Sequence, residues 1–138
     1  LLAPLRATPS AAPTAQRRST NYLICIFAQL DTHNLGRMLR LPLGLLPETA
    51  TVRVLGGINN GCKWVVGSSV HGCWLGHYES RKQALVSHLI GSGMTVFDIG
   101  ANVGFYTLAF ARLVGHGGEV WAFEPDCRNV SYLQEHID

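Results

Sequence analysis

The sequence predicts an α/β fold, the beginning of a doubly wound parallel sheet preceded by a β-hairpin and a helix. Two short apolar runs, residues 95–99 and 119–123, are typical of strands. Apolar residues at helical spacing lie between these runs, and a second stretch of the same kind follows the later run. Strands that alternate with helices in this order indicate a parallel sheet.

Composition limits the classes of protein that fit. The chain has 138 residues, and a domain has roughly 100–200. Apolar residues make up 47% and charged residues 14%, which excludes wholesale disorder. The net charge is +2, and the longest compact apolar stretch, residues 22–30, is too short to span a membrane. We therefore expect no nucleic-acid partner, no membrane partner and a cytoplasmic location, with the four cysteines as free thiols.

The chain divides into four predicted parts. Residues 1–20, rich in Ala, Pro, Ser and Thr, are interpreted as a flexible leader, and residues 21–50 as a poorly defined helical or irregular segment. Residues 51–92 form a hairpin and helix extension, and residues 93–138 form the first part of the doubly wound domain. Because the chain lacks an initiator Met and stops within a predicted helix, we expect an incomplete chain that is inactive alone.

The extension is predicted from alternation and turn residues. Val52 and Val54 alternate with Arg53, and an Asn/Gly cluster separates them from a β-rich run at 63–66, which indicates a hairpin. The Gly, Ser and His content of residues 67–76 predicts a loop. Residues 80–90 are predicted as a helix whose apolar face carries four residues: Ala84, Leu85, His88 and Leu89.

The last part of the chain has the clearest pattern. Residues 95–99 are expected to form a buried parallel strand that ends at a glycine turn. Residues 104–114 are predicted as a helix, which the glycines at 115–118 end, and residues 119–123 are predicted as the second strand. Asp126 can then cap a helix with an apolar face of three residues: Val130, Leu133 and Ile137.

The candidate site is the turn after the first of these strands, together with the acid after the second. In an open α/β sheet, ligands bind beyond the carboxyl ends of the strands. Gly100 lets backbone approach a ligand, and Gly104 lets the following helix pack closely on the strand. Glu124 follows Gly104 by twenty residues, where a carboxylate can accept two hydrogen bonds from ribose hydroxyls.

Two cofactors fit this arrangement. A dinucleotide fingerprint has a glycine where this chain has Asn102, and Asp98 before the turn would repel a pyrophosphate. Asp98 suits a ligand that carries an ammonium group, and S-adenosylmethionine is such a ligand. The residues thus favour the methyl donor. The alternatives are an NAD(P)-binding oxidoreductase and a glycine turn in an α/β protein without a ligand.

The motif also resembles a known family. The run from Asp98 to Thr107, DIGANVGFYT, and the run Phe123–Asp126, FEPD, closely resemble the first two motifs of the FkbM-type methyltransferases. Upstream, residues 72–79 are similar to the stretch that precedes the cofactor motif in that family. The resemblance covers residues 56–138. It implies the start of a Rossmann-like class I domain that uses S-adenosylmethionine to methylate hydroxyl oxygens of sugars or natural products.

The resemblance also implies roles for single residues. Four of them would line the methionine end of the cofactor: Asp98, Gly100, Asn102 and Gly104. Glu124 would hold the ribose, Phe123 and Asp126 would flank the adenine, and Tyr78 and Glu79 would lie near the site.

The expected partner is a small-molecule or glycan acceptor, and the oligomeric state stays open. A class I sheet has about seven strands, and only the first two are predicted here, so no catalytic residue can be named. A non-catalytic interaction domain with the same fold is a further alternative.

Other reactive side chains are expected to be structural. Four cysteine and histidine residues lack the paired spacing of a zinc site: Cys62, His71, Cys73 and His77. No metal is therefore predicted. His88 is interpreted as a packing histidine, and three others as exposed: His33, His116 and His136. Cys127, beside the expected adenine pocket, is interpreted as a small packing residue. The tryptophans are expected to pack in the core or in pocket walls: Trp64, Trp74 and Trp121.

Overall fold

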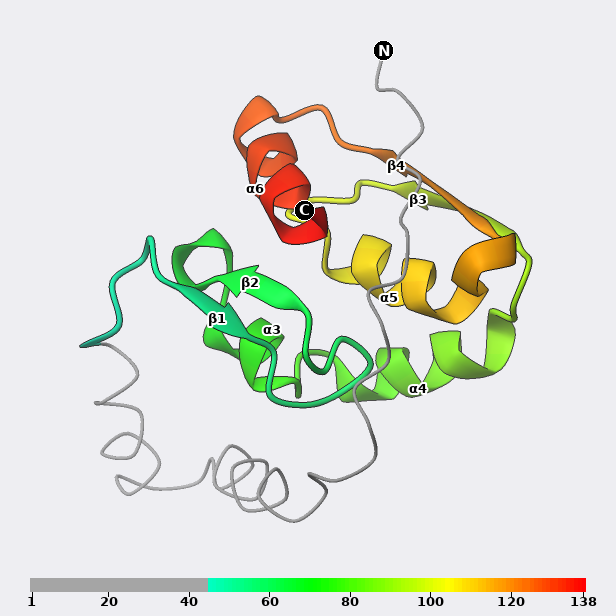
Figure 1. The fold of residues 1–138 in the computed structure, drawn as a ribbon, viewed down its shortest axis with the longest axis horizontal. Coiled ribbons are helices and arrows are strands. Elements are labelled where there is room, and N and C mark those ends of the chain that lie inside the picture. Colours follow the sequence, from blue (N-terminus) through cyan, green and yellow to red (C-terminus); the bar gives the residue numbers. More distant parts are fainter. Residues whose placement is uncertain (1–44) are drawn as a thin grey trace.

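The computed structural model describes residues 45–138, and its element order is β1-β2-α3-α4-β3-α5-β4-α6 with two short 3-10 turns (Figure 1). The fold is a mixed α/β arrangement with one antiparallel and one parallel two-stranded sheet. The expectations for residues 1–20, for most of the segment 21–50, and for Cys25 and His33 lie outside the described residues.

The predicted hairpin is confirmed. Strand β1 (Thr51–Arg53) pairs antiparallel with β2 (Lys63–Val65), with Val52 opposite Trp64. The connection needs backbone that glycine adopts easily, because Gly57 and Gly61 have φ values of +69° and +84°. Val54, just after β1, is fully buried and receives a hydrogen bond on its carbonyl from the Gly61 N–H.

The predicted loop at residues 67–76 is wrong. The segment forms a 3-10 turn, Val66–Ser68, and the helix α3 (His71–Leu75). Helix α3 buries Cys73, Trp74 and Leu75, and the Leu55 N–H donates to the Trp74 carbonyl at 2.8 Å. Burial against the hairpin therefore stabilises a short helix that the local Gly and Ser content disfavours.

Helix α4 (Ser80–Leu89) is confirmed as a helix, but its predicted apolar face is wrong. Leu85 and Leu89 are 56% and 64% exposed, and His88 is exposed rather than packed. The buried residue is Gln83, whose Oε1 accepts from the Ile58 N–H at 2.9 Å and whose Nε2 donates to the Tyr78 carbonyl. These amide hydrogen bonds, one to the hairpin turn and one to the segment before α4, determine which face of the helix turns inward.

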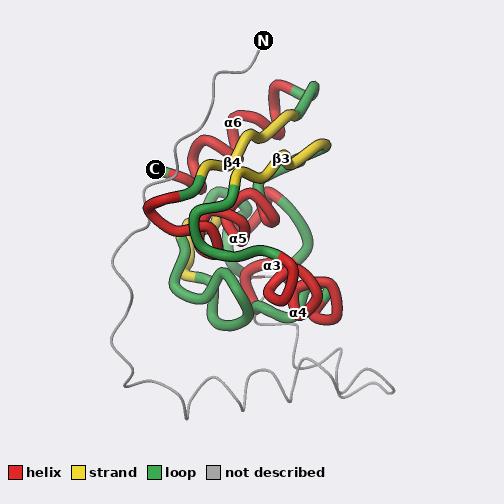
Figure 2. The backbone as a smooth tube through the Cα atoms, turned by 90° about the vertical axis from the view of Figure 1, so that its right-hand side faces the viewer, coloured by secondary structure: helices red, strands yellow, loops and turns green. Residues whose placement is uncertain are grey.

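The strand–helix–strand unit is confirmed. Strands β3 (Thr95–Ile99) and β4 (Glu119–Phe123) pair in parallel, with Thr95 opposite Glu119. Helix α5 (Phe105–Val114) connects them through the 3-10 turn Gly115–Gly117 and packs along one face of the pair (Figure 2). Helix α6 (Cys127–Ile137) packs on the same side, because its Leu133 joins Ala101 and Ala122 in one cluster.

The opposite face of this sheet is open, so the expectation of a fully buried strand is wrong. Phe97 and Ile99 are 61% and 76% exposed. The Phe97 ring lies roughly parallel to the rings of Trp121 and Phe123, each with its centroid 6.3 Å away. Side chains of a strand alternate between faces, and both described helices that pack on the sheet lie on one side of it.

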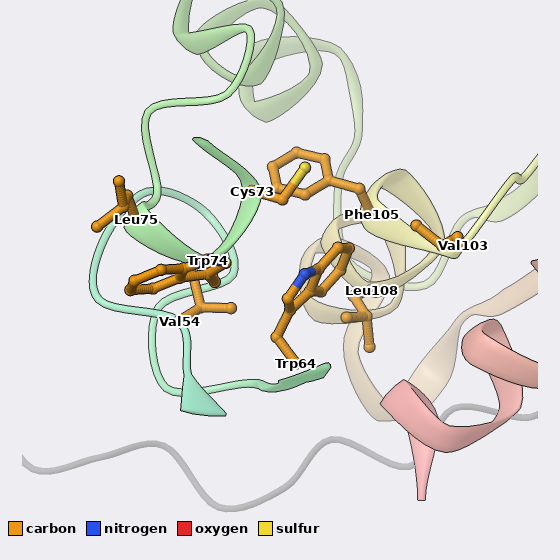
Figure 3. Packing of buried hydrophobic residues seen from close by; sticks show 8 residues of the cluster. All are labelled: Val54, Trp64, Cys73, Trp74, Leu75, Val103, Phe105 and Leu108. Carbon is orange, nitrogen blue, oxygen red and sulfur yellow. The ribbon is translucent and has the colours of Figure 1, made fainter. Parts of the chain in front are cut away.

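The main core lies between the hairpin and the start of α5 rather than within the parallel sheet. It consists of eight buried residues: Val54, Trp64, Cys73, Trp74, Leu75, Val103, Phe105 and Leu108 (Figure 3). Trp64 meets Phe105 edge to face, with the ring centroids 6.0 Å apart. Trp64 and Trp74 are core residues as predicted, whereas Trp121 lies on the open face. None of the described helices has the length and apolar character that crossing a membrane requires.

Candidate functional site

The glycine turn after β3 lies at the end of both parallel strands. The Gly100 and Ala101 N–H groups donate to the Phe123 carbonyl at 2.9 and 3.0 Å, which ties the turn to the end of β4. Gly100, Asn102 and Gly104 all have positive φ, at +79°, +51° and +92°. A Cβ at Gly100 would meet no atom within 4 Å. The backbone of the turn is therefore open to an approaching ligand at this point.

Glu124 lies against this turn and organises it. Its Oε2 accepts from the Asn102 N–H at 2.8 Å, and its Oε1 accepts from the Asp126 N–H at 3.0 Å and from Asn129 Nδ2 at 3.3 Å. These donors, above all the Asp126 N–H, lower the pKa of the Glu124 carboxyl. The carboxylate is therefore ionised at neutral pH, and its two oxygens, with about four lone-pair sites, still have acceptor capacity.

Asp98 is turned toward α5. Its Oδ2 accepts from Thr107 Oγ1 at 2.6 Å, and its side chain is buried. Burial raises the pKa of the Asp98 carboxyl, and the hydrogen bond from Thr107 acts in the opposite direction. Asp98 thus links the end of β3 to the first turns of α5, directly beneath the glycine turn.

Tyr78 and Glu79 directly precede α4, and their side chains contact the first turn of α5. The Tyr78 ring meets Phe105 edge to face at a centroid distance of 5.1 Å, and the Tyr106 hydroxyl donates to Glu79 Oε2 at 2.9 Å. Glu79 also forms an ion pair with Lys82, and both contacts lower the pKa of its carboxyl. Glu79 has the left-handed φ of +45°, which is uncommon for a non-glycine residue.

Phe123 and Asp126 flank Glu124 in the chain but face different surroundings. The Phe123 ring is on the open face of the sheet, stacked on Phe97. Asp126 Oδ1 accepts from the N–H groups of Arg128 and Asn129 at 2.8 and 3.1 Å and so caps α6 as predicted. Cys127, the first residue of α6, is exposed, so its interpretation as a packing residue is wrong.

Two buried polar residues near the site were not predicted from the sequence. Asn59 donates from Nδ2 to the Phe105 carbonyl at 2.8 Å, although its place in an Asn/Gly cluster indicates only a turn residue. His136 is 3% exposed, so the prediction of an exposed histidine is wrong. A signal for its burial was present, because His136 follows Leu133 by three residues on the inner face of α6.

The residues considered for a metal do not form a metal-binding cluster in the described part of the chain. Within residues 45–138, no three His, Cys, Asp or Glu side chains gather as a metal site requires. Cys73 is a free thiol that lies 3.7 Å from Ser69 Oγ, and burial raises its pKa to about 11. Cys62 and Cys127 are also free.

Comparisons of the chain with protein-family models, with curated proteins and with solved structures find no match. The class of protein that the geometry defines is thus an α/β protein with a glycine turn and an acidic residue at adjacent strand ends.

The two glycines of the turn provide a matched test of its packing. Gly100→Ala is expected to lower the free energy of unfolding by about 1–2 kcal/mol, the usual cost of a left-handed non-glycine residue. Gly104→Ala is expected to lower the free energy of unfolding by about 1–3 kcal/mol more than Gly100→Ala does, because the added Cβ would lie 3.0 Å from the Cγ of buried Leu133. Urea unfolding measures both values. Equal losses would contradict the close packing of Gly104 on α6.

Proposed function

We propose that this chain binds S-adenosylmethionine at the ends of β3 and β4 and contributes to methyl transfer to a hydroxyl of a small-molecule or glycan acceptor. The observation that carries the proposal is the hydrogen bond from the Asn102 N–H to Glu124 Oε2 at 2.8 Å. It joins the glycine turn of one strand to the acid of the next, where a ligand would lie across both ends.

The charge of the site supports a cationic ligand over a pyrophosphate. The Asn102 N–H, one of the backbone groups that an anion at such a turn would use, already donates to the Glu124 carboxylate. The pKa values of Glu124 and Glu79 are both lowered, so both carboxylates are ionised; Lys82 balances the charge of Glu79, and the negative charge at the turn is that of Glu124. Negative charge repels the phosphates of a dinucleotide and attracts the ammonium and sulfonium groups of S-adenosylmethionine.

The remaining groups suit a nucleoside and an amino-acid tail. Glu124 is placed to accept from a ribose hydroxyl with the acceptor capacity that its three internal hydrogen bonds leave. The open backbone at Gly100 leaves room for the methionine portion of the ligand. The ion pair of Glu79 with the ammonium of Lys82 is the same type of contact that the ammonium group of the ligand would make with a carboxylate. Phe123 and Asp126 stand beside Glu124, where the adenine would extend.

In this proposal the chain contributes mainly orientation. The bound cofactor supplies an activated methyl group, because its sulfonium is a good leaving group. Glu124 and the glycine turn fix the position of the ligand, which lowers the entropic cost of aligning it with an acceptor oxygen. A general base for the hydroxyl proton is not assigned to any described residue.

Calorimetry with four ligands tests the proposal on the 138-residue chain. We expect S-adenosylhomocysteine and the cationic analogue sinefungin to bind, and adenosine to bind more weakly because it lacks the ammonium. NAD should not bind. Binding of NAD without S-adenosylhomocysteine would favour an oxidoreductase, and no binding of any of the four would favour a non-catalytic domain.

A further inference from the structure

His136 connects three parts of the fold from within the core. It belongs to α6, its Nε2 lies 3.0 Å from the Val65 nitrogen of β2, and its Nδ1 lies 2.7 Å from the Val103 carbonyl oxygen in the glycine turn. The ring also stacks on Trp64, with the centroids 4.0 Å apart and the planes 15° from parallel. Helix α6, the hairpin and the candidate site therefore meet at one imidazole.

The partners of the ring determine where its proton lies. A backbone N–H can only donate, so Nε2 must accept from Val65. The proton of the neutral ring is then on Nδ1, from which it donates to the Val103 carbonyl. Only the neutral ring with this tautomer satisfies both neighbours, because a protonated Nε2 would point an N–H at the Val65 N–H.

Val103 transmits this contact to the candidate site. It follows Asn102 directly, and its own N–H donates to Asn102 Oδ1 at 2.7 Å. The Asn102 N–H in turn donates to Glu124. The position of the Val103 carbonyl thus affects the left-handed backbone of Asn102 and the hydrogen bond on which the proposed ribose contact depends.

We propose that His136 is a positioning residue of the cofactor site, whose neutral imidazole holds Val103 and the glycine turn against the hairpin and releases them when it is protonated. The ligand-binding part of this inference rests on the proposed function. Its structural part, the connection between the imidazole and the turn, does not.

The surroundings of the ring favour the neutral form. Burial among Trp64, Tyr132 and the core lowers the pKa of His136. Two charged groups act on it in opposite directions: Lys63 of β2 disfavours the imidazolium, and Glu135 of α6 favours it. The glycine turn presents the Val103 carbonyl, which favours a protonated Nδ1.

The sign of the pH dependence follows from this. The unfolded chain protonates His136 near its ordinary pKa of 6.5, whereas the folded chain does so at lower pH. The unfolded state therefore binds more protons in mild acid. The contribution of His136 to stability is complete above about pH 6.5 and decreases as the pH falls from there through the lowered folded pKa.

Nuclear magnetic resonance on the whole ¹⁵N-labelled chain tests the contact without any ligand. At pH 8 we expect the His136 Nδ1 to carry the proton and Nε2 to be an acceptor. During titration toward pH 5, the amide signals of Val65, Asn102 and Val103 should change with the same midpoint as the His136 ring. The proposal would be overturned if Nε2 carried the proton at pH 8, or if the amide signals did not change with the titration midpoint of the His136 ring.

Two substitutions separate the two hydrogen bonds of the ring. The His136→Asn amide can replace Nδ1 as donor to Val103, whereas the longer His136→Gln side chain can replace Nε2 toward Val65. We expect His136→Asn to keep more affinity for S-adenosylhomocysteine than His136→Gln. His116→Asn, at an exposed histidine, is the control that should match the original chain. Equal affinity of the two His136 variants would contradict the positioning role.

The pH profile of S-adenosylhomocysteine binding completes the test. Affinity of the original chain should fall at least about twofold as the pH decreases from 7.5 through the lowered pKa of the His136 ring, because the competent neutral form is depleted. His136→Asn should abolish this dependence, and His116→Asn should preserve it. A pH dependence that persists in His136→Asn would overturn the proposal. If no variant binds the ligand, the proposed function fails, and the resonance experiment still decides the role of His136.

Discussion

Trp64→Ala is expected to lower the free energy of unfolding by about 3–5 kcal/mol, the usual cost of removing a buried aromatic side chain. Trp64 is fully buried, meets Phe105 edge to face and stacks on His136. Its removal would open a cavity between the hairpin, α5 and α6. Small domains are stable by only about 5–15 kcal/mol, so the substitution should remove a large fraction of the free energy of unfolding.

The matched control for this change is Trp121→Ala. Trp121 is a tryptophan of the same chain, but it lies on the open face of the parallel sheet, where its ring stacks on Phe97. Trp121 is only partly buried, so its loss should cost about 1–2 kcal/mol, from the aromatic pair together with the buried part of the ring. Chemical denaturation followed by circular dichroism measures both variants. A loss for Trp64→Ala no larger than that for Trp121→Ala would contradict the position of the core.

Glu124→Ala is expected to weaken the binding of S-adenosylhomocysteine at least about tenfold, because charge-assisted hydrogen bonds are among the strongest polar contacts. The substitution removes the proposed ribose acceptor and also the acceptor for the Asn102 and Asp126 N–H groups. Glu124→Gln should lose less, since its amide oxygen keeps one acceptor. Isothermal titration calorimetry gives the dissociation constants.

Glu48→Ala is the control for the loss of one negative charge. Glu48 is exposed and precedes β1, away from the ends of the parallel strands. Its substitution should leave the dissociation constant unchanged, and circular dichroism should show the same helix content in all variants. If Glu124→Ala binds as tightly as Glu48→Ala does, the ribose role of Glu124 is wrong.

The effects of acid on Glu124 and His136 should occur in different pH ranges. The lowered pKa of Glu124 means that its contribution is complete above its ordinary value of 4.5 and decreases as the pH falls through the folded value. The contribution of His136 already decreases below about pH 6.5. A loss of binding in acid that disappears in His136→Asn is therefore due to His136, and a loss that persists in that variant at lower pH is due to Glu124.

The secondary elements that carry a strong local signal are predictable from the amino-acid sequence alone. The hairpin, the strand–helix–strand unit and the Asp126 cap all follow from period-2 or helical spacing, from turn glycines and from a capping side chain. The proximity of Glu124 and the glycine turn also followed from the sequence, because the carboxyl ends of adjacent parallel strands meet at one edge of a sheet.

Which faces are buried and what the polar side chains contact depends on the packing of elements that are distant in the sequence. Helix α3 forms because Trp74 and its neighbours are buried against the hairpin, and α4 turns Gln83 inward because its amide completes the hydrogen bonds of a distant turn. His136 became a core residue because Val65 and Val103, remote in sequence, present a donor and an acceptor on either side of one ring. Helical spacing from Leu133 places His136 on the inner face of α6, but its two partners depend on where three elements meet in space, which local periodicity does not specify.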